Sequence, residues 1–326
     1  MITEKQKHRF IVLLVGIVII FFTISCKSDV ENNSTIVYGL SLVNTFTGYE
    51  NVYEPDSIVQ IDLSKGIYKN LCATDKFEGL SSAYFKAYSK NQNMIVYYDP
   101  MKRKIGLIHL DNLTCETIDL NTDSTYKGIK SLAIIENKSL LVLFKAHYNY
   151  ADKSHSIDIV EINLKTKIAI SKSIDFDYTQ YIFTAVDEIN NRIFLVPNNN
   201  YSEHSDKLYI YNYQSNELTT KSINANFLDV HYSSANQCLV GSSYTKNGVG
   251  LLTYSINNQK TDTIGSYKEI IGIRIGMNYF DKINNSYWIG ILITQAPDYL
   301  KLTNISLSDV SYSKSIQMRK FIDIIN

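Results

Sequence analysis

The chain has 326 residues, 45% of them hydrophobic, and its 32 acidic side chains balance its 32 Lys and Arg side chains. This composition is sufficient for a packed core and excludes the strong positive charge typical of nucleic-acid-binding proteins, so we predict no nucleic-acid partner. With 25 Tyr but only 4 Pro and 1 Trp, the chain is rich in a residue that favours strands, which predicts a β-rich fold.

Residues 1–25 have the three parts of a secretory signal peptide. A basic start at residues 5–9 precedes an apolar run at residues 10–24, and the small Ser25 then precedes Cys26. The run is shorter than the roughly 20 residues that a spanning helix needs. A cleaved signal peptide is therefore favoured over an uncleaved membrane anchor, and either one places the body of the protein outside the cytoplasm.

The order Thr23-Ile24-Ser25-Cys26 resembles the bacterial lipobox, although Thr23 stands where Leu is usual. The resemblance implies that Cys26 is acylated and becomes the first residue of the mature protein, with residues 26–33 as lipidated cysteine and linker. The polar, acidic linker is similar to that of surface lipoproteins of Bacteroidota-type bacteria. We therefore expect a protein of the cell envelope, anchored by its lipid in the outer membrane, with the bilayer as a partner and its body on the periplasmic or the surface-exposed side.

Three further cysteines, Cys72, Cys115 and Cys238, cannot all pair within the chain, and none has the CxxC spacing of a zinc or redox site. We predict three buried free thiols.

From residue 57 onward the sequence repeats a β-rich run, a polar turn and a second β-rich run. Six such hairpins occur, at residues 57–71, 105–120, 158–171, 207–223, 251–265 and 300–316. Their spacing of about 43 to 54 residues suits a four-stranded propeller blade. Between them lie inner strand pairs joined by Asn-containing turns, at residues 88–98, 133–144, 185–196, 229–242 and 277–291. Each unit is thus predicted to run strand A, Asn turn, strand B, loop, strand C, polar turn, strand D.

The two ends of the chain predict how the ring closes. The final FIDIIN, residues 321–326, aligns with the strand A sequences AVDEIN and YFDKIN, whereas ENNSTIVYGLS, residues 31–41, aligns with the turn and strand B of INNSYWIGIL. One blade is therefore split, and its strand A comes from the C-terminus. We predict an all-β, six-bladed β-propeller of four-stranded blades over residues 34–326, a single domain closed by the C-terminal strand completing the N-terminal blade.

This pattern resembles six-bladed β-propellers in general, and with the lipobox it is similar to the largely uncharacterised propeller lipoproteins of Bacteroidota. Because no WD, kelch, YWTD or NHL signature is present, the resemblance implies fold and location only, and it carries no catalytic residues across.

Propellers commonly bind ligands on the face that holds the B–C connections, and all six predicted B–C loops contain Tyr. Tyr offers rigid contact area, so these residues are the predicted ligand-binding set, suited to a saccharide or an envelope protein. The set comprises Tyr49, Tyr53, Tyr97, Tyr98, Tyr148, Tyr150, Tyr201, Tyr244 and Tyr299. A chain with this much Tyr also places some in loops by chance.

The histidines define an alternative. His147, His155 and His204 fall in B–C loops of neighbouring blades with carboxylates nearby, a combination that could hold a divalent metal, although loop histidines are usually solvated. His231 follows Asp229 by two residues, so on a strand the two side chains would share a face and could form a general base, or simply a hydrogen-bonded pair.

No GxSxG, HExxH, phosphate-binding Gly loop or EF-hand pattern occurs, and no cofactor is predicted beyond the metal that the histidines could hold. We therefore favour a non-enzymatic binding module over its alternatives. These are a carbohydrate-active lyase or hydrolase that uses the histidines, and a structural subunit of an envelope assembly.

Overall fold

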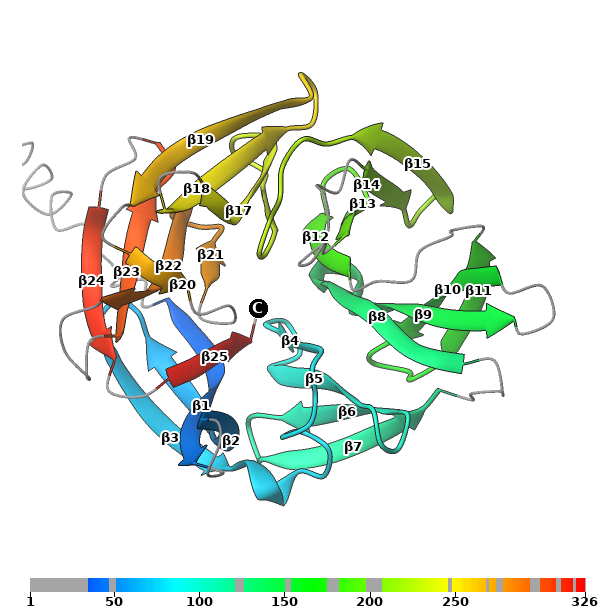
Figure 1. Ribbon diagram of the computed structural model, residues 1–326. Helices are drawn as coiled ribbons and strands as arrows, with labels where there is room; N and C mark the ends of the chain where they lie inside the picture. Colours follow the sequence, from blue (N-terminus) through cyan, green and yellow to red (C-terminus); the bar gives the residue numbers. More distant parts are fainter. Residues whose placement is uncertain are drawn as a thin grey trace, which may run out of the picture.

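The computed structural model describes residues 35–46, 51–120, 126–149, 154–174, 182–197, 207–245, 248–267, 270–273, 278–293, 300–308, 312–318 and 321–325. Within these ranges the chain consists of strands and two short 3-10 segments, η1 (Thr74–Lys76) and η2 (Glu136–Lys138). The strands form six sheets arranged around one axis (Figure 1). The predicted six-bladed β-propeller is therefore confirmed. None of the described segments forms a helix with the length and apolar character needed to cross a membrane.

Each blade is an antiparallel sheet that runs from an innermost strand A to an outermost strand D. Blade 1 contains β25 (Phe321–Ile325), β1 (Ile36–Phe46), β2 (Asn51–Asp62) and β3 (Ile67–Ala73). Blade 2 contains β4 (Lys86–Ser89), β5 (Met94–Asp99), β6 (Lys104–His109) and β7 (Thr114–Asp119). Blade 3 contains β8 (Tyr126–Ile135), β9 (Leu140–Asn149), β10 (Ser154–Asn163) and β11 (Ala169–Ile174).

The remaining blades follow the same order. Blade 4 contains β12 (Ile182–Asp187), β13 (Arg192–Pro197), β14 (Lys207–Asn212) and β15 (Glu217–Ser222). Blade 5 contains β16 (His231–Ser233), β17 (Cys238–Thr245), β18 (Gly248–Ser255) and β19 (Lys260–Tyr267). In blade 6 the inner strand is split into β20 (Ile270–Ile273) and β21 (Tyr279–Asp281), and β22 (Ser286–Ile293), β23 (Leu300–Ser306) and β24 (Tyr312–Met318) follow.

The last strand of the chain completes the first blade, as the chain ends predict. β25 pairs antiparallel with β1, and Tyr38 lies opposite Ile325. Ile322 of β25 is fully buried in the hydrophobic cluster that joins blades 6 and 1. On the other side, Asp323 forms an ion pair with Lys86 of β4 in blade 2, with 3.0 Å between oxygen and nitrogen. β25 therefore links blade 1 to both of its neighbours, close to the ring axis (Figure 1).

Residues with left-handed backbone close the turns at one end of the blades. At the A–B turns these residues are Asn93, Ser139, Asn191, Gln237 and Asn285, and at the C–D turns they are Gly66, Leu113, Lys167, Asn216 and Gln259. Asn tolerates this conformation, which explains the predicted Asn-containing turns. The two turns of a blade are also tied together, because the N–H of Tyr213 donates to the carbonyl of Asn191 at 3.1 Å.

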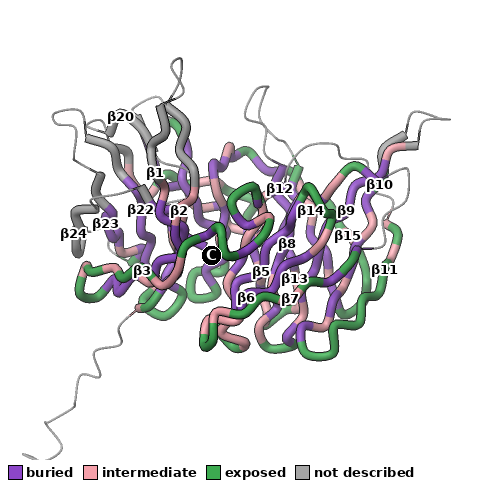
Figure 2. Tube along the Cα trace, turned by 90° about the horizontal axis from the view of Figure 1, so that it is seen from below, coloured by how far each residue is buried: buried purple, intermediate pink, exposed green. Residues whose placement is uncertain are grey.

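The hydrophobic core is divided among the six spaces between neighbouring blades, so each sheet buries both faces. In β13, Ile193 and Leu195 belong to the cluster between blades 3 and 4, whereas Phe194 and Val196 belong to the cluster between blades 4 and 5. Figure 2 accordingly shows buried segments along the strands and exposed segments at the turns. As a consequence, the strands contain continuous apolar runs rather than alternating apolar and polar residues.

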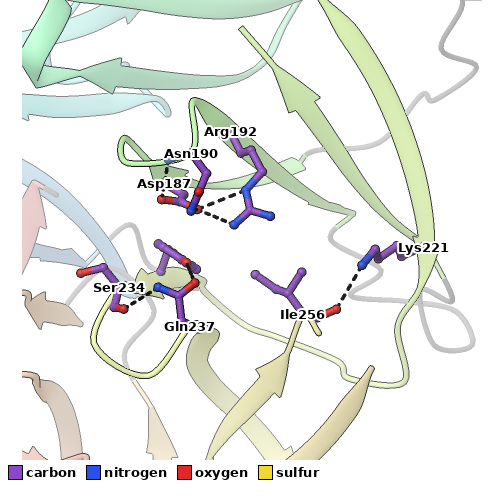
Figure 3. Close-up of polar contacts among 8 residues, drawn as sticks. Asp187, Asn190, Arg192, Lys221, Ser234, Gln237 and Ile256 are labelled. Carbon is purple, nitrogen blue, oxygen red and sulfur yellow. Dashed lines mark hydrogen bonds and ion pairs between the residues drawn. The ribbon is translucent and has the colours of Figure 1, made fainter. Parts of the chain in front are cut away.

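Polar contacts also connect the blades. Lys221 of β15 extends from blade 4 and donates to the carbonyl of Ile256 in blade 5 at 3.1 Å (Figure 3). The Glu136 carboxylate of blade 3 accepts the backbone N–H of Lys90 in blade 2 at 2.8 Å. In turn, the backbone N–H of Glu136 donates to the Glu188 carboxylate of blade 4 at 3.1 Å. Side chains from the turns thus hold neighbouring blades in register.

The three described cysteines are free thiols, as predicted, but they are not all buried. Cys238 is buried, Cys72 is half-buried and Cys115 is exposed. Cys115 lies in β7, an outermost strand that is largely exposed, so the prediction of burial is wrong there.

Shortening Ile322 tests the closure of the ring. We expect Ile322→Ala to lower the free energy of unfolding by about 2–5 kcal/mol, because it leaves a cavity in the cluster between blades 6 and 1. Ile168→Ala, at a side chain that is 62% exposed, is the control and should change it by less than about 0.5 kcal/mol. Denaturant unfolding measures both values, and equal effects would contradict a closing role for β25.

Candidate functional site

Part of the predicted site lies outside the described residues, namely Cys26, Tyr49, Tyr150, Tyr201, His204 and Tyr299. Tyr53 and His155 lie in β2 and β10, but their side chains are not described. The predictions for these residues stay predictions. The others are found at four separate places, which are taken in turn below.

Tyr97 and Tyr98 do not belong to a B–C loop, and that prediction is wrong. Both lie in β5 and are 1% and 5% exposed. Tyr97 packs into the cluster between blades 1 and 2, and Tyr98 into the cluster between blades 2 and 3. Because β5 is covered on both faces, its buried run extends to Asp99, and the B–C connection is the short turn at residues 100–103.

A cavity of about 290 Å³ lies beside Tyr97. The Tyr97 hydroxyl donates to the backbone carbonyl of Glu78 at 2.7 Å. Two lysines that line the cavity are paired with acids: Lys102 with Glu78 at 2.5 Å and Lys104 with Asp119 at 3.1 Å. These pairs leave little net charge at the cavity wall, so the cavity has no clear preference for a charged ligand.

The second place lies between blades 2 and 3, and we call Tyr98, Arg103, Tyr126, Lys145 and His147 the Tyr126 cluster. The hydroxyl oxygens of Tyr98 and Tyr126 are 2.6 Å apart in a buried hydrogen bond. The guanidinium carbon of Arg103 and the ammonium nitrogen of Lys145 each lie 5.5 Å from the centre of the Tyr126 ring. Two cations therefore share one aromatic ring.

These side chains come from elements that end on the same face of the ring. Tyr126 begins β8, Lys145 and His147 lie near the end of β9, and Arg103 lies in the β5–β6 turn. Strand A begins, and strand B ends, at the face of the B–C connections. The Tyr126 cluster is therefore on the face where binding residues were predicted.

His147 lies beside a carboxylate. Its Nε2 lies 3.0 Å from Oδ2 of Asp158 in β10, and its ring meets Tyr126 edge to face with 6.4 Å between ring centres. Asp158 also accepts the Ser173 hydroxyl at 2.7 Å. The next residue, Tyr148, lies under the Lys127 ammonium at 5.9 Å. His147 and Tyr148 thus lie in β9 rather than in a B–C loop, so that part of the prediction is wrong, but both are at the end of the strand on the B–C face.

The phenols of the cluster stay neutral near pH 7. Burial raises the pKa of Tyr98 and of Tyr126, and the positive charge of Arg103 opposes this increase at both groups. The guanidinium is therefore within electrostatic reach of both hydroxyl groups.

The third place is a buried polar network between blades 5 and 6. The Asp229 carboxylate accepts hydrogen bonds from the Ser242 backbone N–H at 2.9 Å, the Ser242 hydroxyl, the Tyr287 hydroxyl and Nε2 of His231 at 3.3 Å. The amide of Asn278 donates to the Ser242 hydroxyl at 3.1 Å. The predicted contact between Asp229 and His231 is therefore present.

This network is saturated. A carboxylate has about four acceptor positions, and four donors occupy those of Asp229. Burial by itself would raise the pKa of Asp229, but the hydrogen bonds from His231, Ser242 and Tyr287 outweigh it and lower the pKa below its usual value of 3.8. His231 bonds to Asp229 rather than to Ser242, so the network lacks the nucleophile–base contact of acyl-transfer enzymes. Its arrangement is that of a structural joint.

The fourth place is Tyr244 in β17, which is 61% exposed and stands alone among the predicted residues of the described chain. Across the described ranges, no group of three or more His, Cys, Asp or Glu side chains is placed to hold a metal ion. The metal prediction also depended on His155 and His204, whose side chains lie outside those ranges.

Sequence reasoning missed Arg103, Tyr126 and Lys145. One signal was available for Lys145, because it interrupts the buried run LLVLF of β9. No comparable signal marks Arg103 or Tyr126, which meet only after blades 2 and 3 pack together.

No protein-family model and no curated protein matches the chain. Among solved structures, TolB from Acinetobacter baumannii is similar at 12% identity with a TM-score of 0.58, covering 89% of this chain and 65% of that one. This chain thus spans about 65% of the length of TolB. A chain of a nidogen/laminin complex is similar at 9% identity and a TM-score of 0.54, covering 89% of this chain and 98% of that one.

An oligogalacturonate lyase in complex with manganese is similar at 10% identity and a TM-score of 0.52, covering 86% of this chain and 78% of that one. At these identities the likeness shows the propeller fold alone.

Removing the Asp229 charge tests the structural joint. Asp229→Asn should lower the free energy of unfolding by about 3 kcal/mol near pH 7, because it replaces an acceptor of four hydrogen bonds. Since the folded pKa is lowered, this contribution is present above pH 3.8 and is lost as the pH falls through the folded pKa. Thermal unfolding from pH 7 to pH 3 should therefore show the two proteins converging in acid.

The matched control for Asp229→Asn is Asp262→Asn, at a carboxylate that is 57% exposed and pairs with Lys260. It should have little effect at any pH. A constant difference between wild type and Asp229→Asn down to pH 3 would contradict a lowered pKa.

Proposed function

We propose that the protein is a lipid-anchored, extracytoplasmic binding module that holds a ligand or partner protein on the face of the B–C connections. The Tyr126 cluster is the observation that carries this proposal. It brings two cations, two phenols and an imidazole to that face from two neighbouring blades. Aromatic side chains with a few convergent polar groups are typical of ligand sites.

The hydrogen bonding and the protonation of the titratable groups favour binding over catalysis. Asp229 is saturated by four donors, and His231 is one of them. The phenols of Tyr98 and Tyr126 stay protonated. These groups supply hydrogen bonds and charge, which is what recognition needs.

A carbohydrate-active lyase or hydrolase is the second candidate, and the pairing of His147 with Asp158 at 3.0 Å favours it. A carboxylate at one ring nitrogen can orient an imidazole as a general base. One similar propeller is an oligogalacturonate lyase in complex with manganese. Elemental analysis of protein purified without added metal or chelator separates the candidates: about one equivalent of zinc, manganese or calcium would favour the enzyme.

The location part of the proposal depends on residues 1–33, which resemble a lipoprotein signal and linker of the Bacteroidota type. We expect mass spectrometry of the membrane-extracted protein to find an acylated Cys26 as its first residue. Cys26→Ser should leave the chain unprocessed or release it from the membrane. A mature protein that retains residues 1–25 would contradict lipid anchoring.

Replacement of tyrosines on the binding face tests the site. The triple variant Tyr148→Ala, Tyr150→Ala and Tyr201→Ala should abolish binding of a ligand found by glycan and partner screening, because it removes most of the aromatic contact area of two blades. Its melting temperature should fall by no more than a few degrees, since Tyr148 is a half-buried residue at the end of β9 and Tyr150 and Tyr201 are predicted in loops. Calorimetric titration and thermal unfolding measure the two effects.

The control is Tyr68→Ala in β3, a half-buried tyrosine on an outer strand of blade 1. It should leave binding unchanged. Equal binding by the triple variant and wild type would place the site elsewhere.

A further inference from the structure

The two cations of the Tyr126 cluster have no acidic partner among the described residues. Lys145 is only 7% exposed, and its ammonium contacts the ring of Tyr126. Its cross-strand neighbour Asp158 directs its carboxylate to His147 instead, at 3.0 Å. Arg103 likewise contacts the Tyr126 ring. A buried ammonium without an ion-pair contact is less favourable than a paired one, and a second cation at the same ring adds repulsion.

The hydroxyl pair leaves one proton without an acceptor. Tyr98 and Tyr126 carry two hydroxyl protons between them but form one mutual hydrogen bond, at 2.6 Å. The Tyr126 hydroxyl donates to that of Tyr98, so the O–H of Tyr98 has no acceptor among the described residues. The guanidinium carbon of Arg103 lies 5.5 Å from the centre of the Tyr126 ring, so the cation and the hydroxyl pair involve the same residue.

The start of β8, next to the cluster, is open at Gly128. Gly128 follows Tyr126 by two residues, in the part of β8 where the pairing with β9 is irregular. It has a left-handed φ of 97°, and a Cβ placed there would meet no atom within 4 Å. Arg103 is itself exposed at the adjacent turn. Arg103 and Gly128 are thus the open points at the edge of the cluster.

We infer that the Tyr126 cluster binds an oxyanion, with Arg103, Lys145 and the spare hydroxyl proton of the tyrosine pair as donors. The inference rests on the proposed binding function and names the class of its ligand. A carboxylate, sulfate or phosphate would supply the missing counter-charge and accept the spare proton. The planar guanidinium suits two oxygens of one such group, while the ammonium acts as a compact charge.

The oxyanion is either free in solution or carried by an acidic saccharide, and the experiment separates these sources. Full-length protein in detergent is titrated calorimetrically with sodium sulfate, sodium phosphate, a glucuronate-containing oligosaccharide and a neutral glucose oligosaccharide, all at matched ionic strength. Thermal unfolding is followed with the same probes. We expect binding and an increase in melting temperature with the anionic probes only. Tighter binding of the acidic oligosaccharide would identify the saccharide source, and equal binding would identify the free anion.

Two variants test the donors. Lys145→Gln and Arg103→Gln should each weaken oxyanion binding about tenfold or more, the loss typical of a charge-assisted hydrogen bond. Arg103 is exposed, so its replacement should leave the fold intact even if the change at buried Lys145 does not. The control is Lys138→Gln, since Lys138 also lies over a tyrosine, at 4.7 Å from the Tyr213 ring, but at the turn end of blade 3. It should bind as wild type does.

Two outcomes would overturn the inference. One is the absence of any oxyanion effect on the wild type at matched ionic strength. The other is unchanged oxyanion affinity in both Lys145→Gln and Arg103→Gln. If a neutral ligand binds this face and both variants retain it, the oxyanion assignment fails but the proposed binding function stands. If the face binds neither neutral nor anionic ligands or partners, the proposed function fails as well.

Discussion

Closure of the ring by β25 is the constraint on which the rest of the structure depends. Each blade buries both faces of its sheet against its neighbours, so an open ring would expose one face of two blades and a free strand edge. β25 prevents this by pairing with β1, by burying Ile322 between blades 6 and 1, and by its ion pair from Asp323 to Lys86 of blade 2. The first and last parts of the chain must therefore meet before the interfaces of blade 1 with blades 6 and 2 are complete.

Because the core is divided among the interfaces between blades, buried polar chemistry is also concentrated there. The network around Asp229 joins blades 5 and 6, and the Tyr126 cluster joins blades 2 and 3. Neither is a site on one element, and each depends on the relative position of two sheets. The short A–B and C–D turns hold that position at the opposite end, where Glu136 links blades 2 and 3 through backbone N–H groups.

The charges of Asp229 and Lys145 are both largely removed from water, and they are compensated in different ways. A charge removed from water must be compensated by hydrogen bonds or by an opposite charge. Asp229 has four donors, and its pKa is lowered although burial alone would raise it, which indicates a completed structural joint. Lys145 has an aromatic ring but no carboxylate among the described residues, and Arg103 shares that ring. Asp229 thus has its compensation within the described structure, whereas buried Lys145 has only the ring of Tyr126, which it shares with the exposed Arg103.

The sequence by itself determined the local features: the strand repeat, the Asn residues at left-handed turns, and the closure implied by the matching ends FIDIIN and ENNSTIVYGLS. It also placed Asp229 beside His231, since the two are close in the chain. Strand period and turn chemistry depend on neighbouring residues, so a single sequence can reveal them. The tertiary structure alone decided that Tyr97 and Tyr98 are buried in two different interfaces, that Cys115 is exposed, and that Arg103 and Lys145 meet at Tyr126. These outcomes depend on how one blade packs against the next, and that packing is set by contacts between residues far apart in the chain.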